Sequence, residues 1–250
     1  MCRHIAYLGE PVALGELLVR PPHALLRQSW EPRTQDSGVV NADGFGVGWY
    51  AEGDPVPARY RRVGPIWGDF SFADLARVVR SGAFLGAVRG ATLPGADGEA
   101  AAAPFTAGPW LFSHNGSVER WSDSLAELAS VLPAQELLQL EARTDSALLW
   151  GLVLHRLRAG DAPGAALADT VREVAAAVPG ARLNLLLTDG AQIAATAWRN
   201  SLWYLSGHDR VVVASEPYDD DPHWREVPER TLVTADRSDV VLIPLKEPSA

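Results

Sequence analysis

Hydrophobic and polar positions along this chain follow two alternating patterns. Short apolar runs ended by Gly, Pro or Asn predict β-strands, whereas longer stretches with apolar side chains at helical spacing predict helices. The predicted strands are 3–8, 45–50, 59–63, 83–88, 110–112, 182–187, 193–198, 211–214, 231–234 and 240–243. The predicted helices are 70–80, 122–131, 146–158 and 163–178, with a helical turn at 23–27. Strand runs on both sides of central helices predict an α+β fold, with antiparallel sheets and helices packed in layers in one domain.

Several boundaries follow from individual residues. Gly9 and Pro11 are expected to end the first strand, and residues 13–20 fit either a strand or a short helix. Ser122 is expected to cap the helix that it begins. Residues 93–104 are rich in Gly, Ala and Pro, so we expect a loop there, with a lid as its candidate role.

The strand at 45–50 follows a turn signal, Asn-Ala-Asp-Gly, and carries glycine at alternate positions. Glycines on one side of a strand let another backbone or a ligand come close. A dinucleotide-binding loop is a poor alternative, because Gly53, Pro55 and Pro57 follow where that motif requires a helix.

The first two residues carry the main candidate chemistry. Cys2 is the only cysteine, and its small side chain permits removal of Met1. The mature chain would then begin with a thiol and a free α-amine on one residue. Their ordinary pKa values, about 8.5 and about 7.7–8.0, allow the amine to accept the thiol's proton near neutral pH. Cys2 is therefore a candidate nucleophile with its own base; the alternative is an unimportant residue at a frayed terminus.

Three further motifs come where predicted strands end or helices begin. Arg89 ends a buried strand and suits a carboxylate ligand, although a surface arginine beside a loop is the simpler local reading. Asn115-Gly116 offers a side-chain amide and a backbone N–H to an oxyanion, although a hairpin turn is the simpler local reading. Asp145 suits an ammonium group, although a helix cap explains it as well.

Composition and charge exclude several classes of function. The formal net charge is −9, and the few basic residues are scattered, so we expect no nucleic-acid partner. A single cysteine excludes a disulfide framework within the chain. The six histidines lack ligand spacing, so we expect no metal and no cofactor.

The beginning of the chain carries no targeting signal that we recognise. The first ten residues include Arg3, His4 and Glu10 and contain no apolar core of a signal peptide. No apolar run approaches the length of a membrane span. We therefore expect a cytoplasmic protein without a membrane partner.

Taken together, these motifs resemble one family. The stretches that carry the resemblance are Met1-Cys2, Asn41–Tyr50, Arg89–Thr92, His114-Asn115-Gly116 and Thr144-Asp145. They occur in the order of a class II glutamine amidotransferase domain, which is an N-terminal-nucleophile (Ntn) hydrolase. The resemblance implies a four-layer αββα sandwich of two antiparallel sheets between helices. It also implies that residues 1–250 form one such domain, with Met1 removed.

The resemblance also implies roles for the residues. Cys2 would attack a γ-glutamyl amide carbonyl with its own amine as base, while Asn115 and the Gly116 N–H hold the oxyanion.

The same resemblance implies how the glutamyl group is bound. Arg89 would bind the glutamyl α-carboxylate with help from Thr92, and Asp145 would bind the α-amine. A zwitterionic head group does require one cation and one anion held apart, which these residues supply.

The opening is similar to one branch of the family. Residues 2–9, 21–26 and 28–30 resemble the stand-alone amidohydrolases of ergothioneine biosynthesis, which cleave γ-glutamyl-hercynylcysteine sulfoxide. Many glutamine-using members carry Trp and His where Gly90 and Leu93 stand here, which suits a bulkier leaving group. The candidate aromatic contacts for its trimethylammonium group are Trp30, Trp49, Trp67, Trp110 and Trp121.

The expected partner is thus a small-molecule γ-glutamyl substrate. The sequence leaves open whether the chain forms a homo-oligomer. Two other readings remain: a glutaminase subunit that supplies ammonia to a separate synthase, and an inactive relative used as a binding module. Glutamine turnover would favour the first, and retention of Met1 the second.

Overall fold

Two antiparallel sheets form the centre of the computed structural model, which describes residues 2–34, 40–91 and 98–246. The first sheet contains, in spatial order, β11 (Arg225–Glu226), β9 (Trp203–Gly207), β10 (Arg210–Ala214), β1 (Arg3–Ala13), β4 (Arg80–Arg89), β2 (Gly44–Trp49) and β3 (Ala58–Arg62). The second contains β13 (Val240–Pro244), β12 (Thr231–Ala235), β8 (Ile193–Ala197), β7 (Arg182–Thr188), β6 (Trp110–Ser117) and β5 (Phe105–Ala107).

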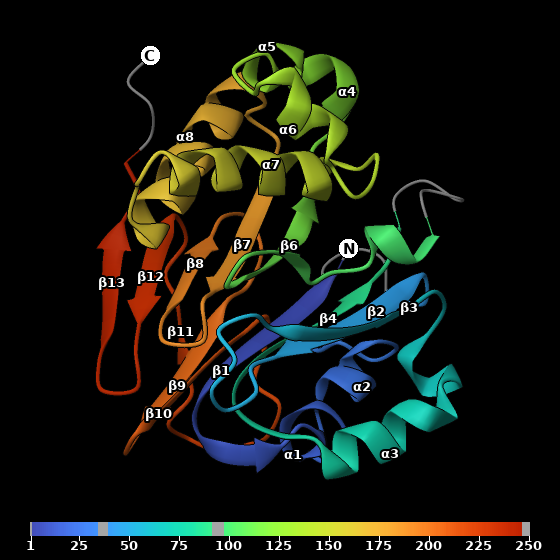
Figure 1. The fold of residues 1–250 in the computed structure, drawn as a ribbon. Coiled ribbons are helices and arrows are strands. Elements are labelled where there is room, and N and C mark those ends of the chain that lie inside the picture. Colours follow the sequence, from blue (N-terminus) through green and yellow to red (C-terminus); the bar gives the residue numbers. More distant parts are fainter. Residues whose placement is uncertain (1, 35–39, 92–97, 247–250) are drawn as a thin grey trace.

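Helices cover the outer face of each sheet, which gives the four layers of the predicted αββα sandwich (Figure 1). The first sheet is covered by α1 (Gly15–Leu18), α2 (Leu25–Gln28) and α3 (Phe70–Val78), with η1 (Ile66–Gly68) before α3. The second is covered by α7 (Asp145–Arg158) and α8 (Pro163–Ala177), beside α4 (Trp121–Ser124), α5 (Ala126–Ala129) and α6 (Ala134–Leu138). A short η2 (Gly98–Ala101) precedes β5.

Side-chain alternation explains this layering. In β1, Ile5 and Tyr7 pack toward α1–α3, whereas Ala6 and Leu8 pack between the two sheets. Because successive strand residues point to opposite faces, one apolar run such as β1 serves two cores at once. A third core lies between the second sheet and its helices.

The first strand is longer than we predict from its glycine and proline. It continues through Gly9 and Pro11 to Ala13, with an irregular register between Leu8 and Val12. The Tyr7 hydroxyl donates a hydrogen bond to the Glu10 carbonyl within this irregular part. A bulge of this kind lets a strand absorb residues that interrupt regular pairing.

The predicted strand at 110–112 is also longer, and this changes the interpretation of the oxyanion motif. β6 continues to Ser117 and pairs with β7, so that Asn115 lies opposite Asn184 and Gly116 opposite Leu183. The alternative of a hairpin turn at Asn115-Gly116 is therefore wrong. The pairing with β7 comes from residues about 70 positions later, which a local turn signal does not reveal.

The remaining differences are local. The predicted helix at 122–131 is divided into α4 and α5, and Ser122 lies inside α4 instead of capping it. The predicted strands do not include β5, which pairs with β6, or β9 and β11, which pair with each other. By contrast, the strand predicted at 59–63 is present as β3, which pairs with β2, and α7 begins at Asp145 after a Thr144 cap.

The glycines of β2 do allow close approach, and the neighbour is protein. A Cβ on Gly46 would lie 2.5 Å from the Ala103 carbonyl oxygen, and a Cβ on Gly48 would lie 2.5 Å from the Leu111 side chain. These glycines therefore allow strand β6 and the segment before β5 to pack against the first sheet.

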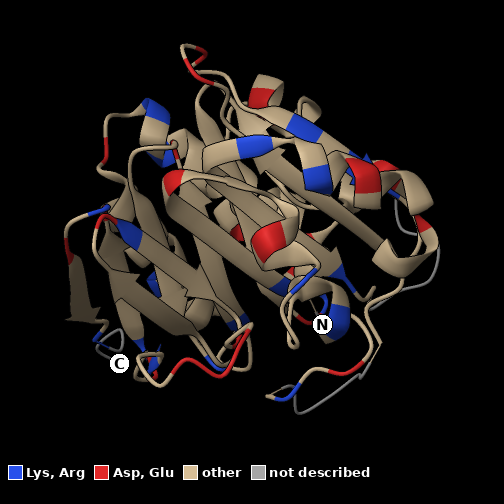
Figure 2. Ribbon diagram, turned by 90° about the horizontal axis from the view of Figure 1, so that it is seen from below, with Lys and Arg blue, Asp and Glu red and all other residues tan. Residues whose placement is uncertain are grey.

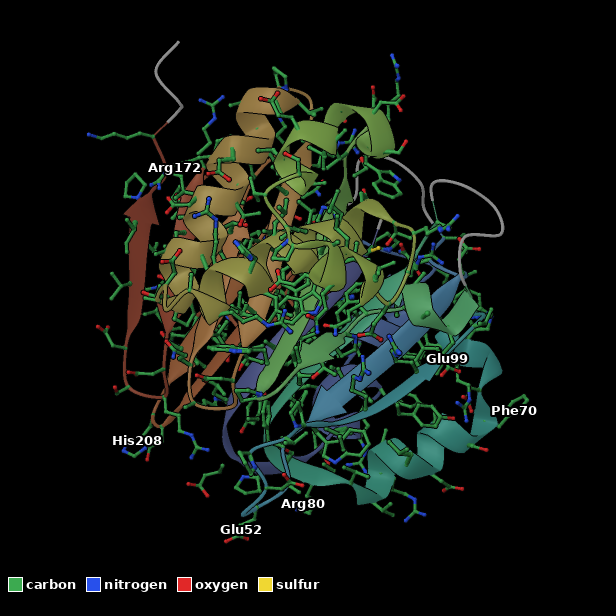
Figure 3. The ribbon with its side chains drawn as sticks, turned by 45° about the horizontal axis from the view of Figure 1, so that its top comes forward. Glu52, Phe70, Arg80, Glu99, Arg172 and His208 are labelled. Atoms are coloured by element: carbon green, nitrogen blue, oxygen red, sulfur yellow. The ribbon has the colours of Figure 1, made fainter. Side chains whose placement is uncertain are left out.

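Charged residues are interspersed over the surface, and Figure 2 shows blue and red positions mixed along the elements. Some form pairs across elements: the Glu99 carboxylate of η2 lies 3.6 Å from the Arg62 guanidinium of β3. Figure 3 labels Glu99. Phe70, at the start of α3, is the most exposed of the large apolar side chains, at 88 %.

Candidate active site

A cavity of about 540 Å³ lies where β1 begins, β4 and β6 end, and α7 begins. Cys2, Arg89, Gly116 and Asp145 all line it. The fold thus brings together four of the six predicted site residues, which are spread over more than half of the sequence. Asn115 is not part of this lining, and Thr92 lies outside the described residues.

Cys2 is positioned by the pairing of β1 with β4. Arg3 lies opposite Val88 in this pair, so Cys2 and Arg89 are the next residues at the same end of the two strands. Cys2 is half-buried. Burial raises the pKa of its thiol, while a hydrogen bond from the Gly90 backbone and the nearby Arg89 guanidinium act in the opposite direction.

His4, the second residue of β1, is buried between the two sheets. Its Nδ1 is 3.2 Å from the Ser113 hydroxyl, and its backbone N–H donates to the Ser215 hydroxyl at 3.0 Å. Burial, together with the nearby His114 and Arg3, lowers the pKa of His4 to about 3. At neutral pH it is therefore an uncharged packing group. Sequence reasoning gave it no role.

The same end of β1 is held by a buried ion pair. Arg3 is 1 % exposed, and its guanidinium lies 4.0 Å from the carboxylate of the fully buried Glu216. Glu216 also accepts hydrogen bonds from the backbone N–H groups of Arg33 and Thr34 and from the Thr34 hydroxyl. These contacts fasten the segment after α2 to the start of β1. No local motif in the sequence indicates them.

Asn115 points between the sheets, as Ser113 does two residues earlier, and is fully buried. Its Nδ2 donates to the Ser215 hydroxyl at 3.3 Å. An amide nitrogen carries two hydrogens, so this contact uses one and leaves the second for another acceptor. Asn115 thus reaches from the second sheet to Ser215, which follows β10 of the first sheet.

Gly116 lies where no side chain fits. A Cβ at this position would be 1.9 Å from the Arg182 carbonyl oxygen and 2.4 Å from Nε2 of His114. Glycine is therefore required by close packing between β6 and the beginning of β7, independently of any catalytic role.

Asp145 makes three hydrogen bonds at the N-terminus of α7. One carboxylate oxygen accepts the Val118 N–H at 2.9 Å, and the other accepts the Ser146 N–H at 2.7 Å and lies 3.3 Å from the Ser146 hydroxyl. The cap of α7 is supplied by Thr144, whose hydroxyl accepts the Ala147 N–H. Thr144, and not Asp145, therefore caps α7.

His114 connects strand β6 to this carboxylate. Its Nε2 lies 2.9 Å from the Arg182 carbonyl, and its Nδ1 lies 3.0 Å from the Ser146 hydroxyl. A carbonyl only accepts, so Nε2 carries a proton, while Nδ1 is within hydrogen-bond distance of the Ser146 hydroxyl. These contacts join strand β6 to the residue beside Asp145.

Arg89 is held by the turn before β2. Its carbonyl accepts the Asp43 N–H, its guanidinium lies 3.4 Å from the Asp43 carbonyl, and the Ala91 N–H donates to the Asp43 carboxylate at 2.7 Å. Asp43 thus fixes the segment that carries Arg89. The sequence showed Asp43 only as a turn residue.

Among the described tryptophans, Trp121 alone lines the cavity. The predicted lid at 93–104 is described only from residue 98; Ala101 and Ala103 of this part form one wall of the cavity. Residues 93–97 lie outside the described part of the chain.

The described ranges contain no group of three or more His, Cys, Asp or Glu residues arranged to hold a metal ion. They also contain no helix whose length and apolar character would allow it to cross a membrane.

Comparisons with known proteins identify a family and several similar chains. The family model for class II glutamine amidotransferases matches residues 24–210. A gamma-glutamyl-hercynylcysteine sulfoxide hydrolase of Mycolicibacterium smegmatis is 44 % identical over 245 residues, which cover 98 % of this chain and 100 % of the relative. A hydrolase of the same name from Mycobacterium tuberculosis is 43 % identical over 246 residues, covering 98 % of this chain and 97 % of the relative.

A solved structure extends the comparison to the fold. A glutamine aminotransferase class-II domain protein from Silicibacter pomeroyi has a TM-score of 0.71 and 26 % identity, covering 98 % of this chain and 100 % of that chain. The predicted sandwich fold is confirmed.

Proposed function

The chain is an amidohydrolase that belongs to the class II glutamine amidotransferase family, and on that premise we propose that it hydrolyses γ-glutamyl-hercynylcysteine sulfoxide to glutamate and hercynylcysteine sulfoxide. The observation that supports this substrate is the sequence identity of 43–44 % with hydrolases named for it, along nearly the whole of both chains. We further infer that the chain is one Ntn-hydrolase domain whose mature form begins at Cys2. The apolar layer shared by both sheets supports a single domain.

In the proposed first step, the α-amine exposed by removal of Met1 takes the proton of the Cys2 thiol. The thiolate attacks the γ-glutamyl carbonyl, and the carbonyl oxygen becomes an oxyanion. We assign its stabilisation to the second amide hydrogen of Asn115 and the backbone N–H of Gly116. The support is that Gly116 lines the cavity with Cys2, and that Asn115 extends into the layer between the sheets.

The amine then gives its proton to the leaving nitrogen, the C–N bond breaks, and a γ-glutamyl thioester of Cys2 remains. Water loses a proton to the same amine and attacks the thioester carbonyl. Cleavage of the C–S bond releases glutamate and restores the thiol. Such a nucleophile replaces one difficult displacement by two easier ones.

We assign the glutamyl α-carboxylate to Arg89 and the α-amine to Asp145. Both line the cavity, and both are oriented by fixed backbone contacts, through Asp43 for Arg89 and through Val118 and Ser146 for Asp145. Groups held in this way bind a charged ligand with little reorganisation. Thr92 remains a proposed helper to Arg89.

The experiment is a comparison of substrates with the purified protein, after mass spectrometry has established the mature N-terminus. We expect rapid glutamate release from γ-glutamyl-hercynylcysteine sulfoxide and slow release from free glutamine. If glutamine is the better substrate, the sulfoxide assignment is wrong and an ammonia-supplying glutaminase takes its place. If neither is cleaved although Met1 is absent, the catalytic assignment itself is wrong.

A further inference from the structure

The cavity that contains Cys2 is larger than a glutamyl group needs. Its volume of about 540 Å³ falls within the range of about 300–1,000 Å³ typical of pockets for drug-sized ligands. Beyond the residues of the proposed mechanism, its lining includes Glu119, Arg120 and Trp121, which follow β6, and Arg143, which precedes α7. We call these four residues the outer wall.

Trp121 is the apolar part of the outer wall. Its half-buried side chain packs against the core under α7 and α8 and also lines the cavity. An indole fixed on one side by a core and open on the other to a cavity is a suitable platform for a cation, which is attracted to the ring face within about 6 Å.

The charges of the cavity match those of the whole proposed substrate. Its lining contains three arginines and two carboxylates: Arg89, Arg120, Arg143, Glu119 and Asp145. γ-Glutamyl-hercynylcysteine sulfoxide has three carboxylates, on its glutamyl, cysteinyl and betaine parts, and two cationic nitrogens, the glutamyl amine and the trimethylammonium. After Arg89 and Asp145 are assigned to the glutamyl part, the outer wall retains two guanidinium groups, one carboxylate and one indole. Free glutamine has no group to place against them.

The backbone of the outer wall is unusual at Arg120. This residue has φ 50° and ψ 36°, the left-handed conformation that residues with a side chain rarely adopt. Its guanidinium is exposed and lies 3.3 Å from the Asp123 carboxylate. A strained conformation next to a cavity is a reasonable indication of a functional constraint.

We propose that the outer wall is the leaving-group subsite, an assignment that rests on the proposed function. The face of Trp121 binds the trimethylammonium, with Glu119 adding negative charge nearby. Arg120 and Arg143 bind the two carboxylates of the leaving group. This wall, and not the glutamyl site, determines the preference for a large zwitterionic amine over ammonia.

The test uses two substrates that share the glutamyl group, the scissile amide and the cysteinyl carboxylate. One is γ-glutamyl-hercynylcysteine sulfoxide, and the other is γ-glutamyl-S-methylcysteine sulfoxide, which lacks the hercynyl part. The measured quantity is the ratio of kcat/KM for the first to kcat/KM for the second. We expect Trp121→Ala to lower this ratio about 3- to 30-fold, the range typical of a cation over an indole. Trp121→Phe, which keeps an aromatic face, should lower it less than about threefold.

Two further variants complete the design. Trp67→Ala is the matched control, because Trp67 is partly exposed and lies outside the cavity. It should leave the ratio unchanged. Arg120→Gly removes the guanidinium while placing glycine where the backbone favours it. We expect an unfolding temperature at least equal to that of the parent, and kcat/KM for the hercynyl substrate lowered about two- to fivefold, as for an exposed charge pair.

The outcomes separate the subsite from the function. If the parent protein cleaves the hercynyl substrate with a high ratio and Trp121→Ala lowers kcat/KM equally for both substrates, the subsite assignment is wrong and the function stands. If the parent prefers free glutamine, the function and the subsite fall together. The proposal is supported if the ratio falls in Trp121→Ala but not in the Trp67 control, and if Arg120→Gly lowers kcat/KM for the hercynyl substrate.

Discussion

Replacing Asp145 with asparagine tests the ammonium site while changing few atoms. Both carboxylate oxygens accept backbone N–H groups, from Val118 at 2.9 Å and from Ser146 at 2.7 Å. An asparagine can keep one of these contacts, but its NH2 group must then face the other N–H. The variant therefore loses one hydrogen bond to a charged acceptor, at a cost of about 1.5–3 kcal/mol of folding stability. Helix α7 keeps its Thr144 cap and should remain formed.

The expected effect of Asp145→Asn on substrate binding follows from the same range of hydrogen-bond energies. A charge-assisted hydrogen bond to the glutamyl ammonium that is worth about 1.5–3 kcal/mol corresponds to a decrease in kcat/KM of about 10- to 150-fold. The decrease should appear mainly in KM, because the ammonium keeps its charge throughout the reaction and is bound equally in the ground and transition states. Steady-state kinetics of glutamate release measures it directly.

A second substrate separates binding from damage to the fold. The glutaryl analogue lacks the α-amine, so Asp145→Asn should hardly change its kcat/KM, whereas the parent protein should already process it poorly. An equal loss on both substrates would contradict the ammonium site and would assign Asp145 to joining β6 and α7. An unchanged KM for the γ-glutamyl substrate would also refute the reasoning.

Three other substitutions test different parts of the structure. Cys2→Ala should reduce glutamate release to below about 1 % without changing the circular dichroism spectrum, because the nucleophile is lost; residual turnover above a few per cent would remove Cys2 from that role. Gly116→Ala should lower the free energy of unfolding by about 3 kcal/mol, since its Cβ would lie 1.9 Å from a carbonyl oxygen, and a urea titration that shows no loss would contradict this packing. The pKa of His4 is about 3 in the folded protein and about 6.5 in the unfolded chain. Below pH 6.5 the unfolded chain therefore binds a proton that folded His4 does not. The free energy of unfolding should then fall by about 1.4 kcal/mol for each pH unit between 6.5 and 3, whereas above pH 6.5 it is unaffected by His4. His4→Asn should remove this part of the slope of unfolding free energy against pH, and parallel slopes for the two proteins would show that His4 is not buried in its neutral form.

The buried charges and polar groups near Cys2 have a common effect on the site. Glu216 joins the segment after α2 to β1, and Ser215 joins β10 to both β1 and β6. Buried polar groups that are satisfied by specific partners favour one arrangement of the elements that carry them. The start of β1 is therefore held in one position, as a nucleophile with its own base requires.

The sequence by itself determined most of the strands and helices and the order of the motifs. It also indicated Cys2, Arg89 and Asp145, because their chemistry is visible in local context: a small residue beside Met1, a cation at a strand end, and an acid at a helix start. The physical reason is that alternation, capping and chain position depend on neighbours within a few residues.

Only the tertiary structure decided the environment of these groups. It extended β6 through Asn115, made His4 a buried neutral group, and selected Trp121 among the candidate tryptophans. These outcomes depend on residues distant in the sequence: His4 meets Ser215 across 211 positions, and Asn115 meets it across 100. Desolvation and shape are set by everything that packs around a side chain, and no local window of the sequence contains that information.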